Sequence, residues 1–420
     1  MLYLAFFLLI VIFLVLSEKS QWGSWITPLT VLAVPYTLSV ILIIIYRQFV
    51  PGIPAFYFPS LTIWIFGLLL FKIPSILHAK CLGPHYRQKH FQIESAKCDD
   101  SYHLLRNIAY ICIGISLLKI RSLSGALSSF GSDEFSAEYQ SSSILNHLSV
   151  LLGCIFSYAI YKCDRNHKST FIIIVGALIG MFAIGTKSWI IAPFLIGYYA
   201  RILTGKSKFS IKTTLFPLLI IILIFFFSYY LSLVIWGDNE ISNEILTFIG
   251  NHFIDYCCSG ALTLGIDYEM GFIEPQMTES LFAPVLNVFN AIFNLDYVQV
   301  VNPVFIDVGV LGSSNVRTFF GTIIAYSKNP VLYMALTLVF SFIIYHIYRM
   351  SRKSQSVFLL LVNTANLCFL TFGFFEFYWL NLSCYEIPII FAIMHYLFYL
   401  KPVHIKLRFN KIHREAITTE

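Results

Sequence analysis

Long apolar runs without a charged residue dominate this sequence. Residues 213–236 and 48–71 contain no Asp, Glu, Lys or Arg. A helix that crosses about 30 Å of hydrocarbon needs about 20 apolar residues, so each run can span a membrane. Such runs are too long and too uniformly apolar for the alternating strands of a membrane barrel. They predict an all-α polytopic membrane protein.

The composition agrees with this class, because 58% of the 420 residues are hydrophobic and 12% are charged. An ordinary soluble domain carries about twice that charge. The apolar N-terminus lacks a basic segment and a small-residue cleavage site, so we expect a first span there and no signal peptide. The sequence predicts about eleven spans. They are expected near residues 2–17, 28–46, 57–77, 104–120, 144–161, 169–186, 188–203, 213–236, 331–349, 356–375 and 384–400.

The basic residues predict which loops face the cytoplasm. Assigning alternate loops to the inside places most Lys and Arg residues there, as expected from the positive-inside rule. The N-terminus is then outside and the C-terminus inside. This gives four parts. They are residues 1–236 with spans one to eight and an external loop at 121–143, a large external loop at 237–330, spans nine to eleven at 331–400, and a basic cytoplasmic tail at 401–420.

The large external loop at 237–330 is strongly acidic, with Arg317 and Lys328 as its two cations. Loops longer than about 15 residues without internal structure are uncommon, so we expect helices in it. Residues 281–300 place apolar side chains at helical spacing. They predict an amphipathic helix that lies in the membrane interface or covers the bundle.

Several classes of site are not indicated. The chain has no phosphate-binding glycine motif, so chemistry that depends on ATP is not expected. The basic balance reflects topology and not nucleic-acid binding. The nine cysteines show no CxxC pair and no disulfide framework. The cytoplasmic His and Cys residues between positions 78 and 98 do not have zinc-ligand spacing, and no metal is predicted.

Lys187 is the only charge between residues 169 and 200, at a Gly-Thr-Lys-Ser turn between two apolar helices. A charge at the membrane edge is costly and is therefore a functional candidate. Its ammonium group could meet a lipid-linked phosphate near the outer surface. Alternatively, Lys187 extends to the interface and marks a hairpin turn.

Arg317 lies in a polar segment of the acidic loop, close to the next span. A guanidinium group binds phosphate through two parallel hydrogen bonds, and it could stabilise a pyrophosphate leaving group. The alternative is an ion pair with an acidic side chain of the loop. Arg121, followed by a Gly/Ser-rich stretch, is a weaker candidate that could instead anchor its helix end.

Residues that could act as a base begin just after the eighth span. Helical spacing puts His252, Asp255 and Ser259 on one face, and Asp267 follows. A positioned His or carboxylate can remove the proton from an attacking sugar hydroxyl. A hydrolytic triad is not favoured, because the chain has no GxSxG elbow.

The order of these features resembles the bacterial O-antigen or oligosaccharide repeat-unit polymerases, the Wzy family. The resemblance covers the spans, a modest early external loop and a large loop before the last three spans. Local similarities are SLSGALSSF after the fourth span, the GTKS turn, YCCSGALTLGIDY at residues 256–268, and SNVRTFFGTIIAYSKNPVLYMAL at residues 314–336. The chain departs from the family where it has Lys187 in place of the usual Arg, and where YSKNPV replaces an Asp/Gly segment.

The resemblance implies a GT-C-like bundle in the bacterial cytoplasmic (inner) membrane. It would be a glycosyltransferase that moves a growing glycan from undecaprenyl pyrophosphate to the next lipid-linked repeat unit on the outer face, without metal, nucleotide sugar or other cofactor. Donor, acceptor and lipid bilayer are the implied partners, with a chain-length regulator and a flippase as further ones. Lys187, Arg121, Asn315 and Tyr256 would contact substrate, and Arg317 with His252, Asp255 or Asp267 would be catalytic.

Three alternatives share parts of this pattern. An O-antigen ligase has the same chemistry with another acceptor. A flippase or transporter for lipid-linked oligosaccharide would carry charges deep in several spans. A membrane O-acyltransferase would show catalytic His and Arg in its early spans.

Overall fold

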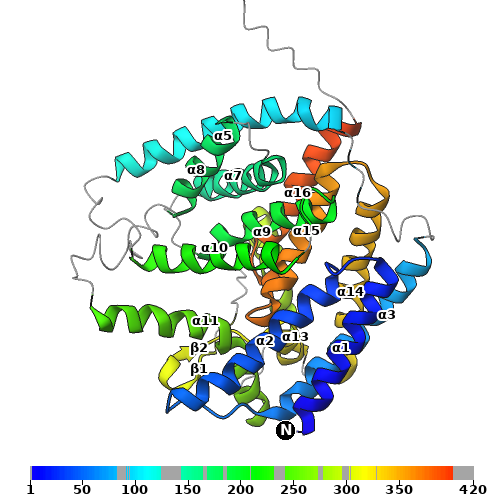
Figure 1. Ribbon diagram of the computed structural model, residues 1–420, viewed down its shortest axis with the longest axis vertical. Coiled ribbons are helices and arrows are strands. Elements are labelled where there is room, and N and C mark those ends of the chain that lie inside the picture. Colours follow the sequence, from blue (N-terminus) through cyan, green and yellow to red (C-terminus); the bar gives the residue numbers. More distant parts are fainter. Residues whose placement is uncertain are drawn as a thin grey trace, which may run out of the picture.

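The computed structural model shows a helical protein, and its described residues include one small β hairpin (Figure 1). It describes residues 2–82, 91, 93, 95–123, 143–163, 168–182, 187–208, 210–230, 242–272, 278–295, 302, 304–327 and 329–400. The helices are α1 (Leu2–Trp22), α2 (Pro28–Phe49), α3 (Leu61–Lys80), α5 (Ser95–Ser122), α7 (Ser143–Lys162), α8 (Lys168–Phe182), α9 (Lys187–Leu203), α10 (Ile211–Tyr230), α11 (Asn243–Glu269), α12 (Ala283–Phe293), α13 (Phe319–Ser327), α14 (Pro330–Lys353), α15 (Val357–Thr371) and α16 (Ser383–His395). Strands β1 (Ile306–Asp307) and β2 (Ser313–Ser314) pair antiparallel.

Within the described residues, eight helices are long and apolar enough to cross a membrane. They are α1, α2, α3, α5, α7, α14, α15 and α16, the last extended to Leu400. The three other predicted spans correspond to α8, α9 and α10, whose apolar parts are shorter. The prediction of an all-α polytopic membrane protein is confirmed, and each predicted span coincides with a helix.

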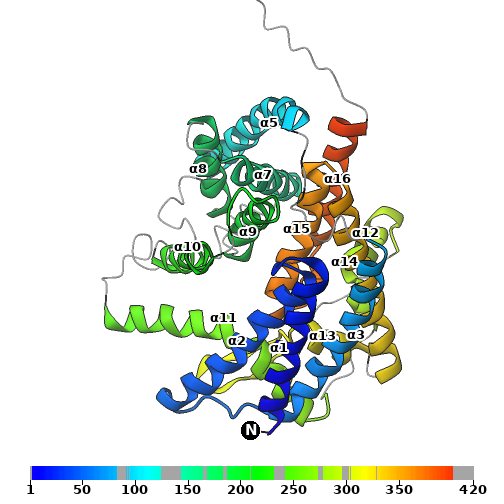
Figure 2. The same ribbon diagram turned by 45° about the vertical axis from the view of Figure 1, so that its right-hand side comes forward.

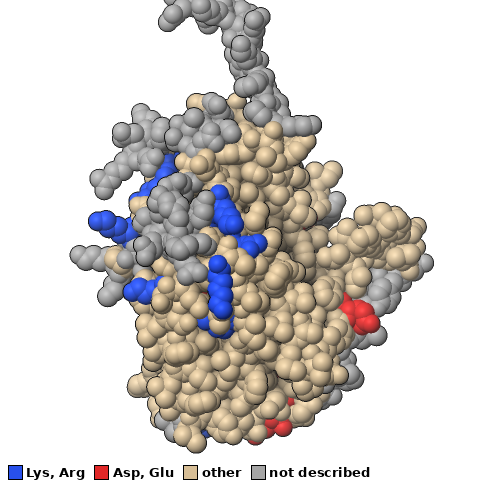
Figure 3. Space-filling view, turned by 90° about the vertical axis from the view of Figure 1, so that its right-hand side faces the viewer, with Lys and Arg blue, Asp and Glu red and all other residues tan. Residues whose placement is uncertain are grey.

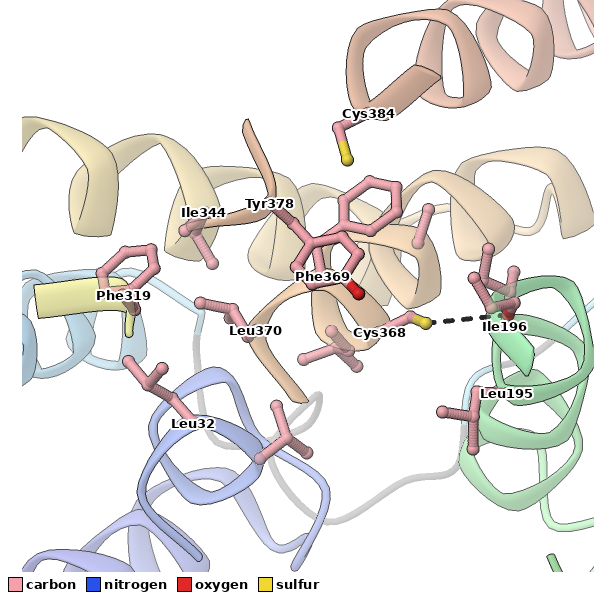
Figure 4. Close-up of a cluster of buried hydrophobic side chains, with 14 of the residues drawn as sticks. Leu32, Leu195, Ile196, Phe319, Ile344, Cys368, Phe369, Leu370, Tyr378 and Cys384 are labelled. Carbon is pink, nitrogen blue, oxygen red and sulfur yellow. Dashed lines mark hydrogen bonds between the residues drawn. The ribbon is translucent and has the colours of Figure 1, made fainter. Parts of the chain in front are cut away.

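The helices form two groups that α15 connects. In Figures 1 and 2, α5, α7, α8, α9 and α10 lie together, while α1, α2, α3, α13 and α14 form the second group. Helix α15 contacts α9 and α16 on one side and α2 and α14 on the other. Cys368 of α15 donates a hydrogen bond to the carbonyl of Ala192 on α9, with Sγ and O 3.6 Å apart. Figure 4 shows the surrounding apolar cluster, to which α2 contributes Leu32 and α13 contributes Phe319.

A buried ion pair joins α1 to α3. Lys72 Nζ lies 2.8 Å from Glu18 Oε1, and the two residues are 6% and 0% exposed. Glu18 also accepts hydrogen bonds from Ser75 and from the Tyr345 hydroxyl on α14. Burying a charge is tolerated only when it is paired and hydrogen-bonded, so this pair fixes how three helices meet.

The predicted loop at 237–330 does contain helices, namely α11, α12 and α13. Its β hairpin packs on the connection between α2 and α3, where Val310 N donates to Gly52 O at 3.4 Å. A side chain at Gly309 would collide with Gly52 O at 2.3 Å, and Gly309 has φ +70. Only glycine satisfies both the close approach and the positive φ.

Charge is separated across the surface. On the face shown in Figure 3, most Lys and Arg side chains gather on the upper and middle left, whereas the Asp and Glu side chains lie on the right-hand side and at the lower edge. This separation corresponds to the loop asymmetry in the sequence, which placed the basic and acidic segments on opposite sides.

Helix α12 is shorter than the helix predicted for residues 281–300. It ends at Asn294, which adopts the left-handed conformation with φ 56 and closes the helix. Its apolar residues face away from the protein, with Phe289 51%, Ile292 67% and Phe293 61% exposed. Of the two alternatives, this exposure favours contact with the membrane over covering the bundle.

We expect the stability of the protein to depend on Glu18 and Lys72 being paired with each other. Replacing Lys72 with Met should destabilise the protein by about 3–5 kcal/mol, because a buried carboxylate is left without its partner. The double variant Glu18→Gln/Lys72→Met should recover part of this loss. Thermal unfolding in detergent measures both, with the exposed Lys80→Met as control. Equal losses in the single and double variants would contradict this role.

We also expect α12 to contact lipid. The fluorescence that Ile292→Trp adds to that of the wild-type protein should be quenched by brominated lipids after reconstitution, because this side chain is exposed on an apolar helix face. A tryptophan at the exposed Glu244, at the start of α11, is the matched control and should be quenched less. Equal quenching at the two positions would argue against lipid contact by α12.

Candidate polar site

Helix α11 carries several of the residues singled out in the sequence. Ser242 caps it, with Oγ accepting from Ile245 N, and the helix continues unbroken for 27 residues. Its close approach to the segment after α15 depends on Gly260, where a Cβ would meet Phe375 O at 2.4 Å. His252, Asp255 and Ser259 all lie on this helix, as the sequence predicted.

The last turn of α11 presents Asp267 to Arg317. Arg317 Nε donates to Asp267 Oδ2 at 2.5 Å, and Arg317 Nη1 donates to the Asn315 carbonyl at 3.2 Å. Arg317 is 2% exposed and Asp267 is 3% exposed. Arg317 thus forms an ion pair, as one of the two alternatives predicted, and its partner Asp267 lies 50 positions earlier in the chain. Removing one partner of such a buried pair typically costs about 3–5 kcal/mol.

The backbone beside Arg317 is in an unusual conformation. Thr318 has φ 63, which is rare for a β-branched residue and costs energy unless its surroundings enforce it. Three contacts hold it. Thr318 N donates to Phe375 O at 3.0 Å, Trp64 Nε1 donates to Thr318 Oγ1 at 3.2 Å, and Thr318 Oγ1 accepts from Gly321 N at 3.3 Å. Arg317 is therefore fixed immediately before α13 begins.

Asn302 links the segments around this pair. Its backbone N donates to the Tyr326 hydroxyl, and its Oδ1 accepts from that hydroxyl, both at 2.8 Å. Its carbonyl accepts from Asn315 Nδ2 at 2.9 Å, and its own Nδ2 donates to Glu376 Oε1 at 3.1 Å. Asn302 has φ 47, a conformation that Asn tolerates better than most residues. This one residue thus joins three separate segments.

Glu376 was not among the residues identified in the sequence. Burial raises its pKa to about 7, although the hydrogen bond from Asn302 lowers it. The backbone bond between Thr318 and Phe375 places Glu376 next to the Arg317 segment. A sequence signal was present, since Glu376 is a lone carboxylate in the aromatic stretch GFFEFYWL between the last two spans.

The polar cluster therefore consists of Asp267, Asn302, Asn315, Arg317, Tyr326 and Glu376. Burial raises the pKa of Tyr326, the charge of Arg317 lowers it and that of Glu376 raises it, so both charges act on this hydroxyl. The cluster combines a fixed guanidinium group with a carboxylate that can exchange a proton near neutral pH. These two functions suit stabilisation of a developing phosphate charge and general base catalysis.

Other predicted base residues lie further along α11. Asp255 is twelve residues from Asp267, which corresponds to about 18 Å along a helix, and His252 is about 22 Å away. Burial raises the pKa of Asp255 to about 6. The His252 ring stacks on Tyr229, with centroids 5.4 Å apart. The structure does not bring either residue to Arg317.

The remaining predicted residues are spread over three elements. Tyr256 stacks on Phe375, with ring centroids 5.4 Å apart, and so contacts the segment that carries Glu376. Arg121 is exposed in the last turn of α5. Lys187 begins α9, and its side chain and the preceding residues 183–186 lie outside the described part of the chain. Within that part, no three His, Cys, Asp or Glu side chains converge as metal ligands.

Comparison with known proteins identifies a family but no activity. Residues 52–404 match the family described as "Family of unknown function (DUF6337)", so the chain belongs to that family. No curated protein and no solved structure matches the chain.

We expect Asn302 to stabilise the cluster through both its side chain and its backbone. Asn302→Gly and Asn302→Ala both lose the side-chain bonds to Glu376 and Tyr326, but only Ala must also place a Cβ at positive φ. Asn302→Ala should therefore unfold with about 1 kcal/mol less stability than Asn302→Gly. Thermal unfolding of the two variants measures this difference, with Asn381 of the 375–382 segment replaced by the same residues as control. A glycine variant less stable than the alanine variant would show that the positive φ of Asn302 is not costly for a residue with a Cβ.

Proposed function

We propose that this protein polymerises undecaprenyl-pyrophosphate-linked oligosaccharide repeat units into an O-antigen or capsular polysaccharide at the outer face of the bacterial cytoplasmic membrane. It is then a glycosyltransferase with a lipid-pyrophosphate-linked donor and no resident cofactor. The observation that carries the proposal is the polar cluster, in which Asn315 and Asn302 connect a buried arginine to a carboxylate with a pKa of about 7 in a polytopic membrane protein.

Arg317 is assigned to the pyrophosphate of the donor. Among the described residues, Asp267 and Asn315 accept two hydrogen bonds from a guanidinium group that can donate five, and the proposal assigns others of these donors to phosphate oxygens. Because Asp267 and Asn315 fix the side chain, little reorganisation is needed as negative charge develops on the leaving group. Asp267 thus becomes a positioning residue for Arg317, and it is no longer the preferred base.

The segments that form the cluster support the side of the membrane proposed for the reaction. Asp267, Asn302 and Arg317 belong to the large loop, and Glu376 belongs to the connection between the last two spans. The charge asymmetry of the sequence assigns both segments to the outside. A lipid-linked donor that has already crossed the membrane would be accessible there.

Further contacts are assigned around this centre. Tyr256 lies against Phe375 and could stack on a sugar ring. Asn315 bonds to Asn302 and supports the Arg317 segment. Lys187 and Arg121 are proposed as outer phosphate contacts, and Asp255 and His252 as contacts to more distant parts of the glycan. A chain-length regulator and a flippase are the proposed protein partners.

An O-antigen ligase-type transfer is the second candidate, because the same cluster would serve the same bond chemistry with another acceptor. Loss of the protein distinguishes the two. Deletion of a polymerase leaves single repeat units on the lipid, whereas deletion of a ligase leaves long polymer that is not transferred. Deletion of a flippase would leave the repeat units on the inner leaflet.

The proposal predicts that the fork of Arg317, and not only its charge, is needed. Arg317→Lys keeps a cation beside Asp267 but loses bidentate phosphate contacts, so long-chain glycan should fall by about 100-fold or more. Arg317→Ala should abolish chain extension. Immunoblots of membranes check that each variant is present, and Arg47→Lys on α2 is the control. Unchanged long-chain glycan in Arg317→Ala membranes would exclude the assigned role.

A further inference from the structure

Glu376 occupies a defined position in the polar cluster. Its Oε1 accepts from Asn302 Nδ2 at 3.1 Å, and no described residue donates a hydrogen bond to Oε2. Asn302 is itself held by Tyr326 and Asn315, so the carboxylate is oriented by a network and not by one flexible contact. A carboxylate held in a fixed orientation is suited to receive a proton from a bound hydroxyl group.

The position relative to Arg317 is also fixed. The bond from Thr318 N to Phe375 O joins the residues immediately next to Arg317 and Glu376. The guanidinium group and the carboxylate both act electrostatically on the Tyr326 hydroxyl. A donor phosphate held by Arg317 and an acceptor hydroxyl held by Glu376 would therefore lie in one site.

The surroundings of Glu376 explain why its pKa is raised. Glu376 acts electrostatically on Tyr326 of α13 and on Cys384 of α16, and Arg317, which pairs with Asp267, also acts on Tyr326. Burial is the largest effect and disfavours the charged carboxylate, which raises the pKa of Glu376 to about 7. A base with this pKa is partly unprotonated at neutral pH and still binds a proton well.

We propose that Glu376 is the general base that accepts the proton of the attacking acceptor hydroxyl, and that its carboxylate defines the acceptor-sugar subsite. This inference rests on the proposed function. The acceptor oxygen forms a bond to the anomeric carbon, the bond from that carbon to the phosphate oxygen breaks, and the electron pair leaves with the lipid pyrophosphate. The hydroxyl proton passes to Glu376 and then to water, and no group is oxidised or reduced.

Glu376→Gln tests the role, because the amide oxygen can still accept from Asn302 but cannot serve as the base. Chain extension with extracted undecaprenyl-pyrophosphate-linked repeat units should fall by about 100-fold or more. Binding of undecaprenyl pyrophosphate should remain, whereas Arg317→Lys should weaken it. Glu386→Gln, at the carboxylate that contacts His147 from α16, is the matched control and should retain activity. Glu376→Asp should keep part of the activity.

The pH dependence adds a second measurement. The wild-type rate should rise with pH until about pH 7 and then level off, because the unprotonated carboxylate is the active form. The folded-state pKa lies above the usual value, so stability should fall between about pH 5 and 7 as Glu376 loses its proton. In Glu376→Gln this fall should be smaller, with the part due to Asp255 remaining, which reports on Glu376 even without turnover.

The outcomes separate the inference from the proposed function. A Glu376→Gln enzyme with the wild-type rate and pH profile would overturn the role of Glu376 and leave the polymerase proposal standing. A wild-type protein that neither binds undecaprenyl pyrophosphate nor extends lipid-linked repeat units would overturn both. Loss of extension in Glu376→Gln with retained lipid binding supports both.

Discussion

The cost of placing charge away from water is the constraint on which this structure depends. An unpaired buried charge would cost several kcal/mol, and the described chain meets that cost by pairing. Glu18 pairs with Lys72 where α1, α3 and α14 meet, and Asp267 pairs with Arg317 beside α13. The first pair is enclosed by aromatic and hydroxyl side chains from neighbouring helices. The second is linked through Asn315 and Asn302 to the further carboxylate of Glu376, and for this reason we assign the reactive site to the second pair.

Most of the fold was predictable because hydrocarbon restricts backbone structure so strongly. Each apolar run became a helix near its predicted position, including the shorter α8, α9 and α10. The end of α12 was missed because Asn294 closes the helix in the left-handed conformation, which a pattern of apolar residues does not reveal. Hydropathy and length were sufficient for the helical class and for the positions of the apolar helices, whereas local backbone geometry could not be predicted from them.

The candidate site was predictable only in part. Arg317 and Asp267 were recognisable as unusual residues, but a partner 50 positions away cannot be read from local spacing. Helical spacing correctly placed His252 and Asp255 on α11, yet it could not show that they lie about 22 and 18 Å from Asp267. Glu376 and Asn302 were missed because their importance arises from tertiary contacts. Asn302 is a single amide in a loop, and Glu376 stands among aromatic residues without a motif.

The polar cluster draws its members from α11, from the loop before α13 and from the connection after α15, and this has a consequence for biogenesis. A chain made from its N-terminus can form the Glu18–Lys72 pair once three spans have been inserted. The cluster, in contrast, is completed only after Glu376 has been synthesised. Until then Asp267 and Arg317 can pair, but Asn302 lacks its last acceptor. A truncated or stalled chain would therefore contain a membrane-embedded scaffold without a finished site, so the reactive arrangement is among the last parts of the protein to form.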